Sequence, residues 1–179
     1  MILITERLIL RNLTEKDASE LFEYSKDEEV GKNAGWKPHE SLEESKQLLT
    51  EIFLGKEDIF GIIEKQTGKL IGTVGLMPDS TRENEDARMI GYAIGKDYWG
   101  KGFMTEAVKR ILSYGFCEKA YDLISVSHYT DNIRSQRVIE KCGFQFEGVQ
   151  RKGERRYDGE LMDKNWYSLT KEEFCQNMN

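Results

Sequence analysis

Residues 89–112 read MIGYAIGKDYWGKGFMTEAVKRIL, and this stretch decides the fold. Its first part, Met89 to Ile94, has the branched and aromatic side chains typical of a strand. Its last part, residues 103–112, repeats apolar side chains at helical spacing. Between the two parts, Gly100 and Gly102 flank a lysine. The stretch therefore predicts a strand, a glycine-containing loop and a long helix in direct succession.

The start of such a helix favours an anion. Its first backbone N–H groups lack intrahelical partners, and the helix dipole adds about half a positive charge there. Gly100 and Gly102 let a phosphate approach the backbone without a Cβ in the way. The loop lacks the third glycine of a dinucleotide-binding fingerprint and the Gly-Lys-Ser/Thr of a Walker loop. From these residues alone, a tight strand-to-helix turn without a ligand is the alternative left open.

Hydrophobic periodicity predicts further elements on both sides of this stretch. Helices are expected after the capping residues Thr14, Ser41 and Asn132, and a loop carrying Trp36 is expected from Gly31 to His39. Strands are expected at Ile4 to Arg11, Phe60 to Glu64, Leu70 to Leu76, Leu123 to Ser127, Phe144 to Val149 and Leu161 to Leu169. This order predicts an α/β (α+β) fold with a mostly antiparallel mixed central sheet and flanking helices.

Length and composition set the class of protein. The chain has 179 residues, of which 39% are hydrophobic, and this is enough apolar material for a packed core. A chain of this length is expected to form one domain, residues 1–179. No apolar run approaches the roughly 18 residues that span a bilayer, and Glu6 and Arg7 soon follow the apolar start. We therefore expect no membrane segment and no secretion signal.

Charge and cysteine content narrow the function further. The chain has 26 Lys and Arg against 32 Asp and Glu, a net charge of −6. This balance disfavours nucleic-acid binding, which needs a basic face, and favours a cationic substrate. Three separated cysteines (Cys117, Cys142 and Cys175) and two histidines predict neither a disulfide framework nor a metal site. They fit a reducing, cytoplasmic setting.

Four segments resemble motifs of the GNAT superfamily of N-acetyltransferases. Residues 98–107 (YWGKGFMTEA) resemble its acetyl-CoA pyrophosphate loop. Residues 5–11 (TERLILR), 132–135 (NIRS) and 141–144 (KCGF) resemble its branch of ribosomal-protein N-terminal alanine/serine acetyltransferases. Because order and spacing agree along the chain, it is identified as a member of this superfamily.

The resemblance implies acetyl-CoA as the cofactor and CoA as the product. It implies that the strands Met89 to Ile94 and Leu123 to Ser127 splay apart and admit the pantetheine arm, while the pyrophosphate lies on the backbone of the loop. The implied cofactor-binding residues are Tyr92, Ala93 and Ile94 on the strand, Gly100, Lys101, Gly102, Phe103 and Met104 at the loop, and Asn132 and Ser135. Asp97 stands where the family loop often has Gln or Arg, so we leave it out of the site.

Two residues are implied to be catalytic. Ser135 is implied as the proton donor to the cofactor sulfur, because Ile139 stands where many family members have a tyrosine. Glu154 is implied as the general base, because residues 88–90 (RMI) lack the glutamate that many relatives carry there. From the residues alone two alternatives stay open: Asn132 and Ser135 as the cap and first turn of a helix, and Glu154 as an exposed loop charge.

Four other features of the sequence are candidates for roles in or near the site. His128 and His39 are candidate bases because histidine titrates near neutral pH, but each lacks a partner motif. Trp36 and Pro38 lie where family members bind the acceptor. The basic cluster is expected to be a solvated face, or to contact an acidic stretch of a protein acceptor; it comprises Arg151, Lys152, Arg155 and Arg156.

The resemblance therefore implies N-acetylation of a primary amine by direct attack in a ternary complex. We expect the N-terminal α-amine of a (ribosomal) protein, which titrates near 8, whereas a lysine amine titrates near 10.4. One alternative is a GNAT enzyme for a small amine (polyamine, aminoglycoside or amino acid), and another is a CoA-binding module without turnover. The expected partners are acetyl-CoA and the acceptor, without a membrane or nucleic acid, and the chain is expected to be a monomer or homodimer.

Overall fold

The structure is a computed structural model that describes residues 1–177, and the chain divides into two compact units. The first unit contains residues 1–75 and 92–107. The second unit contains residues 76–91 and continues from residue 108 to the end of the described chain. Strands β4 (Leu70–Pro78) and β5 (Ala87–Ile94) and helix α4 (Phe103–Ser113) each contribute residues to both units.

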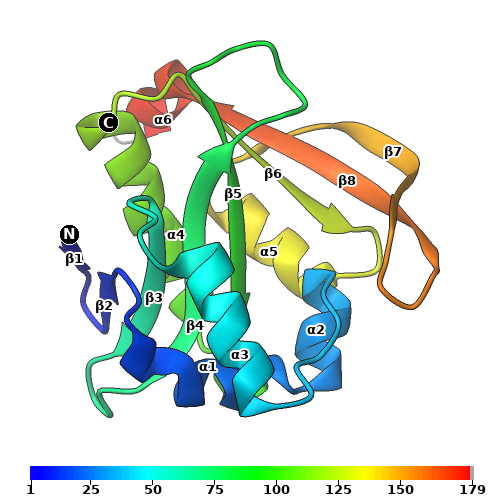
Figure 1. Ribbon diagram of the computed structural model, residues 1–179. Coiled ribbons are helices and arrows are strands. Elements are labelled where there is room, and N and C mark those ends of the chain that lie inside the picture. Colours follow the sequence, from blue (N-terminus) through cyan, green and yellow to red (C-terminus); the bar gives the residue numbers. More distant parts are fainter. Residues whose placement is uncertain (178–179) are drawn as a thin grey trace. The chain divides into compact units, whose positions relative to one another are not determined.

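Antiparallel strands form the sheet of the first unit (Figure 1). Strand β1 (Ile2–Ile4) pairs with β2 (Leu8–Arg11), β2 pairs with β3 (Ile59–Glu64), and β3 pairs with β4. The register sets Leu10 opposite Ile62, and both side chains are fully buried. A slip of one residue would turn these side chains to the other face, so burial fixes the register.

Three short helices complete the first unit: α1 (Ala18–Ser25), α2 (Glu28–Ala34) and α3 (Leu42–Leu48). A π-helical turn, Leu49–Phe53, extends α3. The predicted cap is present, because Ser41 Oγ accepts a hydrogen bond from the Glu44 amide at 3.1 Å. Helices α1 and α3 pack together, and Leu21 and Leu49 are among the residues of the buried cluster beneath them.

The second unit contains strands β6 (Leu123–Tyr129), β7 (Gln145–Arg155) and β8 (Leu161–Thr170), with β8 antiparallel to both others. Helix α5 (Ile133–Lys141) packs against β6, and α6 (Lys171–Asn177) follows β8. Strand β5 runs parallel to β6 over three register pairs, from Ala87 opposite Leu123 to Met89 opposite Ser125. Strand β6 continues beyond this ladder to Tyr129, and the predicted separation of the two strands stays a prediction.

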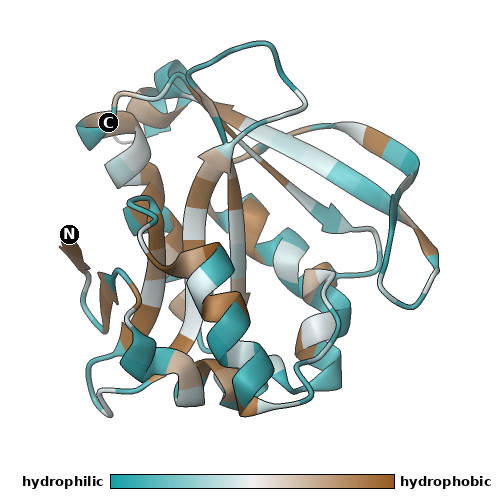
Figure 2. Cartoon of the chain, in the orientation of Figure 1, coloured by the Kyte–Doolittle hydropathy of each residue, from teal (hydrophilic) through white to brown (hydrophobic). Residues whose placement is uncertain are grey.

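Strands β4 and β7 differ in burial. Residues 70–76 of β4 are all buried, whereas nearly every residue of β7 is exposed. Figure 2 shows hydrophilic colouring over much of β7. The described residues thus form eight strands, of which only β5 and β6 are known to pair in parallel, together with helices, so the predicted mixed α/β fold class is confirmed. No helix formed by residues 1–177 is both long and apolar enough to span a membrane.

Three predicted elements differ from the structure. The strand expected from Ile4 to Arg11 is a hairpin, because the Thr5 amide donates to the Leu8 carbonyl oxygen at 3.1 Å and closes a turn. The loop expected from Gly31 to His39 begins inside α2, which ends at Ala34 and is capped by Gly35 with a φ of 89°. The strand expected from Phe144 to Val149 continues to Arg155, so β7 contains Glu154, which one of the open alternatives placed in a loop.

Candidate active site

The predicted anion loop joins β5 to α4 within the first unit. After Ile94 the chain makes a 3-10 turn, Lys96–Tyr98, and Trp99 Nε1 then donates to the Ile94 carbonyl oxygen at 2.9 Å. Gly100 and Gly102 have φ angles of 73° and 81°, which are strained for any residue that has a Cβ. A Cβ on Gly100 would meet nothing within 4 Å, so the chain is open to solvent on that side.

The loop leaves its backbone donors available to a ligand. Among residues 1–177, no acceptor takes a hydrogen bond from the amides of Gly100, Lys101 or Gly102, and all three residues are exposed. Phe103 and Met104 are buried, so only their backbone can reach a ligand. Exposed, unpaired N–H groups at the start of an 11-residue helix fit an anion such as a pyrophosphate.

The predicted strand residues lie just before this loop. Ala93 and Ile94 are buried and Tyr92 is half-buried. Gly72 of β4 packs so closely that a Cβ there would stand 2.4 Å from the Ala93 carbonyl oxygen. The structure therefore places Tyr92 to Ile94 and the loop glycines in one unit, on either side of a single turn.

Asn132 and Ser135 lie at the start of α5 in the second unit. Asn132 Oδ1 accepts a hydrogen bond from the Ser135 amide at 3.1 Å, so Asn132 caps helix α5. This is the structural role that the sequence left open as an alternative to cofactor binding. Ser135 is half-buried in the first turn. A role of either side chain at the cofactor stays a prediction.

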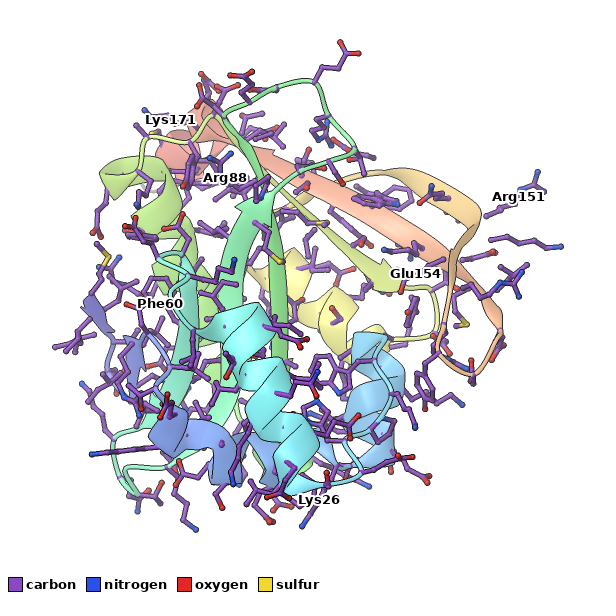
Figure 3. The ribbon with its side chains drawn as sticks, in the orientation of Figure 1. Lys26, Phe60, Arg88, Arg151, Glu154 and Lys171 are labelled. Atoms are coloured by element: carbon purple, nitrogen blue, oxygen red, sulfur yellow. The ribbon has the colours of Figure 1, made fainter. Side chains whose placement is uncertain are left out.

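Glu154 belongs to a side-chain cluster in the second unit, so its interpretation as an exposed loop charge is wrong. Its Oε1 accepts from the Tyr129 hydroxyl at 2.6 Å, and its Oε2 accepts from Lys164 Nζ at 2.8 Å. The three residues come from β7, β6 and β8 (Glu154 is labelled in Figure 3). The Glu154 side chain is 38% exposed, which leaves it accessible to a substrate.

Electrostatics fix the protonation states in this cluster. Burial raises the pKa of Glu154, but the hydrogen bonds from Lys164 and Tyr129 and the charge of Lys164 outweigh it and hold the pKa below its usual value. Burial, the hydrogen bond to Glu154 and its negative charge raise the pKa of Tyr129 far above its usual value. At neutral pH Glu154 is therefore a carboxylate and Tyr129 a neutral donor.

A bulge in β7 places Glu154 in this cluster. Gln150 pairs with Lys164 and Glu154 pairs with Met162, so β7 advances four residues while β8 advances two. Within the bulge Lys152 has a φ of 51°, and a Cβ on Gly153 would stand 2.6 Å from Gln150 Oε1. Bulges commonly re-aim a side chain next to a functional site. The sequence gives no sign of this one, because its alternation of apolar residues is weak.

Both histidines are buried. His39 Nδ1 lies 2.7 Å from Ser45 Oγ, and His128 Nδ1 lies 2.7 Å from the Tyr129 carbonyl oxygen. Burial lowers the pKa of each ring, so both are neutral at pH 7. Such burial argues against either histidine as the base. No group of three or more metal-ligating side chains converges anywhere in residues 1–177.

Trp36 lines a cavity of about 280 Å³ in the first unit. Leu48 and Phe53 contribute to its apolar wall, and His39 and Glu44 to its polar one. The buried Trp36 Nε1 finds no acceptor among the described residues. The predicted contact of Trp36 and Pro38 with an acceptor stays a prediction.

The basic cluster is not uniformly solvated. Arg151, Lys152 and Arg155 are exposed as predicted, and Arg151 extends away from the sheet in Figure 3. Arg156 is an exception, because only 2% of its side chain is exposed and it pairs with Asp158 at 2.7 Å and Glu160 at 2.5 Å. These partners within the β7–β8 turn hold it against the sheet.

The sequence interpretation missed the side-chain pairings that support these sites. Tyr129 and Lys164 hold Glu154, and Arg7 and Glu106 pair beside the loop at 2.7 Å. Arg7 and Glu106 lie in two of the segments that resemble the superfamily, which was the available signal. Their separation by 99 residues hid the pairing.

Comparison with known proteins gives one consistent result. A family model described as "Acetyltransferase (GNAT) domain" matches residues 7–145. The N-acetyltransferase p20 of Bacillus licheniformis, itself described as uncharacterized, is 36% identical over 178 residues, which cover 97% of this chain and 98% of that protein.

Two solved structures are similar across nearly the whole chain. A GNAT-family acetyltransferase from Bacillus anthracis has a TM-score of 0.85 and 26% identity, covering 96% of this chain and 99% of that one. A provisionally named ribosomal-protein-serine acetyltransferase from Vibrio cholerae has a TM-score of 0.78 and 25% identity, covering 95% of this chain and 97% of that one.

Proposed function

We propose that this chain, which belongs to the GNAT family of acetyltransferases, acetylates the N-terminal α-amine of a basic protein, with a ribosomal protein as the leading candidate. The chain is an N-acetyltransferase, and acetyl-CoA is its acetyl donor. The observation that carries the choice of acceptor is the cluster formed by Tyr129, Glu154 and Lys164.

The first unit supplies the residues that we assign to the cofactor. Bound acetyl-CoA supplies an activated acetyl thioester. The amides of residues 100–104 would hold its pyrophosphate, and the strand residues Tyr92, Ala93 and Ile94 would lie along its pantetheine arm. The unpaired amides of Gly100, Lys101 and Gly102 support this assignment, because exposed donors at a helix start match an anion in charge and geometry.

The second unit supplies the residues that we assign to proton transfer. Glu154 would accept the proton of the attacking amine at a carboxylate oxygen, and the Ser135 hydroxyl would donate to the departing sulfur. Attack is direct, within a ternary complex, without a covalent intermediate on the enzyme.

The state of Glu154 favours an α-amine as the acceptor. A carboxylate whose pKa is held low is a weak base, so it suits an amine that is already partly neutral near pH 7. Lys164 already occupies one carboxylate oxygen and would repel a second positive charge held close to the attacking amine, as in a polyamine or an aminoglycoside. The provisional name of the Vibrio cholerae neighbour agrees with a ribosomal protein as the acceptor.

The proposal extends to the domain organisation, the cellular location and the oligomeric state of the protein. Similarity to relatives along nearly the full length supports one acetyltransferase domain, residues 1–179. No disulfide joins Cys117, Cys142 or Cys175 within residues 1–177, which fits the cytoplasm, where a ribosomal acceptor would be found. We propose a monomer or homodimer that binds neither membranes nor nucleic acid directly.

A panel of acceptors tests the proposal. Basic peptides that start with Ala or Ser are incubated with acetyl-CoA beside spermidine, kanamycin, free amino acids and the same peptides with a blocked N-terminus. We expect CoA release and a mass increase at the α-amine, greater at low salt because the net charge of −6 attracts basic peptides.

The other outcomes each exclude part of the proposal. Turnover of the small amines without the peptides would make the enzyme a small-amine acetyltransferase. Tight binding of acetyl-CoA without CoA release in any reaction would favour a binding module.

A further inference from the structure

The turn between β1 and β2 lies against the start of helix α4. Glu106, in the first turn of that helix, accepts hydrogen bonds from the Thr5 hydroxyl at 2.6 Å, the Arg7 amide at 2.8 Å and Arg7 Nε at 2.7 Å. Only 17% of the Glu106 side chain is exposed. Both of its oxygens are therefore bound to one short segment at the other end of the sequence.

This turn is itself held firmly. The Leu8 amide donates to Thr5 Oγ1 at 2.9 Å, and the Arg7 carbonyl oxygen accepts from the Lys65 amide at 2.9 Å. Lys65 Nζ also donates to the Thr5 carbonyl oxygen at 2.5 Å. A turn fixed on both sides gives the Arg7 side chain a defined starting point.

From that point the Arg7 guanidinium spans the anion loop. Its Nη1 donates to the Lys101 carbonyl oxygen at 2.9 Å, and its Cζ lies 4.4 Å from the centroid of the Phe103 ring. A Cβ on Gly102 would stand 3.4 Å from its Nη2. One planar group thus contacts residues on both sides of the glycine and reaches Glu106 as well.

These contacts have two consequences for an anion at the loop. The bond to the Lys101 carbonyl fixes the peptide whose N–H belongs to Gly102, so that donor keeps one direction. The Arg7 charge also neutralises Glu106. An unpaired carboxylate in the first turn would otherwise oppose a second anion bound at the same helix end.

We propose that Arg7 is a positioning residue for acetyl-CoA, which orients the Lys101–Gly102 peptide and neutralises Glu106 beneath the pyrophosphate. This inference rests on the proposed placement of the pyrophosphate at the loop. It assigns a role to the segment of residues 5–7, which the function proposed above does not use.

The test uses calorimetry to measure how tightly the Arg7→Lys variant binds two acetyl donors, acetyl-CoA and acetyl-pantetheine. Lysine keeps the charge but cannot span both Glu106 and the Lys101 carbonyl. We expect the affinity for acetyl-CoA to fall about tenfold. Affinity for acetyl-pantetheine, which lacks the pyrophosphate, should stay within about twofold. Arg110→Lys is the matched control. Arg110 lies further along α4 and pairs with Glu118 at 2.8 Å, so this variant should leave both affinities unchanged.

A second pair of variants distinguishes an effect of the Glu106 charge on binding from a loss of folding stability. Arg7→Gln leaves Glu106 unpaired, so it should weaken acetyl-CoA binding more than Arg7→Lys does. Adding Glu106→Gln to Arg7→Gln should restore part of that affinity, even if the melting temperature of the ligand-free protein falls further. A purely structural role would make the double variant bind no better than Arg7→Gln.

The outcomes distinguish this inference from the proposal on which it rests. The inference is overturned if the Arg7 variants bind acetyl-CoA like Arg110→Lys, if acetyl-pantetheine binding falls equally, or if the double variant shows no recovery. If Gly102→Val binds acetyl-CoA as tightly as the wild type, the loop assignment itself fails, and this inference fails with it.

Discussion

The anion loop at residues 100–102 and the cluster of Tyr129, Glu154 and Lys164 are built in opposite ways. The loop offers backbone amides, and its central side chain, Lys101, is exposed, with Nζ 5.5 Å from the centroid of the Tyr98 ring. The cluster offers one carboxylate, whose position and pKa depend on two other side chains.

Because of this difference, the loop and the cluster should respond differently to mutation. A backbone site tolerates changes of side chain but not an added Cβ at its glycines. A side-chain site loses its chemistry when one atom of the carboxylate changes, even if the fold is intact. We therefore expect changes in the loop to alter affinity for acetyl-CoA and changes in the cluster to alter turnover.

The largest effect is expected for Glu154→Gln. The amide keeps the shape of the side chain but cannot accept a proton, so kcat should fall by about 10²–10⁴-fold. The dissociation constant of acetyl-CoA, measured by calorimetry, should stay the same. Glu160→Gln, in the turn that follows β7, is the matched control because its side chain is 61% exposed and its ion pair within residues 1–177 is with Arg156, outside the cluster. A Glu154→Gln enzyme as active as this control would exclude Glu154 as the base.

The next effect is expected for Gly102→Val. A φ of 81° strains a β-branched residue, and its side chain would crowd a bound phosphate, whereas its Cβ would stand in ordinary contact with Arg7 Nη2 at 3.4 Å. We expect the dissociation constant of acetyl-CoA to rise about tenfold or more. Gly68→Val controls for strain alone, since Gly68 has a φ of 72° and nothing within 4 Å of an added Cβ. Equal binding by the two variants would refute a specific role of the loop.

A smaller effect is expected for Lys164→Gln and Tyr129→Phe. Burial raises the pKa of Glu154, and these two partners hold it down, so removing either raises the pKa. The acid limb of the pH–rate profile should move to higher pH, with a few-fold loss of activity at acid pH and little change above pH 8. An acid limb that stays in place in both variants would mean that another group sets it.

The smallest effect is expected for Glu106→Gln, and it is a loss of folding stability. Burial raises the pKa of Glu106, but bonds from Thr5 and Arg7 outweigh it and leave the pKa below its usual value. A depressed pKa stabilises the fold above the unfolded-state pKa of about 4.3, and this stability is lost as the pH falls through the folded-state pKa. The variant should be less stable than wild type by about 0.5–1 kcal/mol at pH 7.

Urea unfolding of the wild type and Glu106→Gln checks this prediction. The difference between their free energies of unfolding should become smaller below about pH 4. Glu43→Gln, which removes an exposed ion pair with Lys46, serves as its control. A difference that does not change between pH 7 and pH 3 would contradict the role of the Glu106 charge.

The sequence predicted the loop well because its signals are local. Two glycines and the helical period of residues 103–112 lie within one short stretch, and the structure has the strand, loop and helix in that order. The caps of α3 and α5 were predicted for the same reason, since a capping side chain and the amide that donates to it are three residues apart.

The sequence predicted the carboxylate site less well because its contacts are distant. Tyr129 and Glu154 are 25 residues apart, and the bulge that brings them together leaves no periodic trace. The pairing of Arg7 with Glu106 was hidden in the same way. The short helix α2 was missed because it has one buried valine and no apolar stripe.

Single-turnover kinetics test the division between the two regions most directly. The wild type, Gly102→Val and Glu154→Gln are mixed with the preferred peptide acceptor, and the acetylation rate is followed to saturating acetyl-CoA. We predict that Gly102→Val approaches the wild-type rate at saturation, whereas Glu154→Gln stays about 10²-fold or more below it at every concentration. Recovery of Glu154→Gln at saturation, with Gly102→Val remaining slow, would contradict the account.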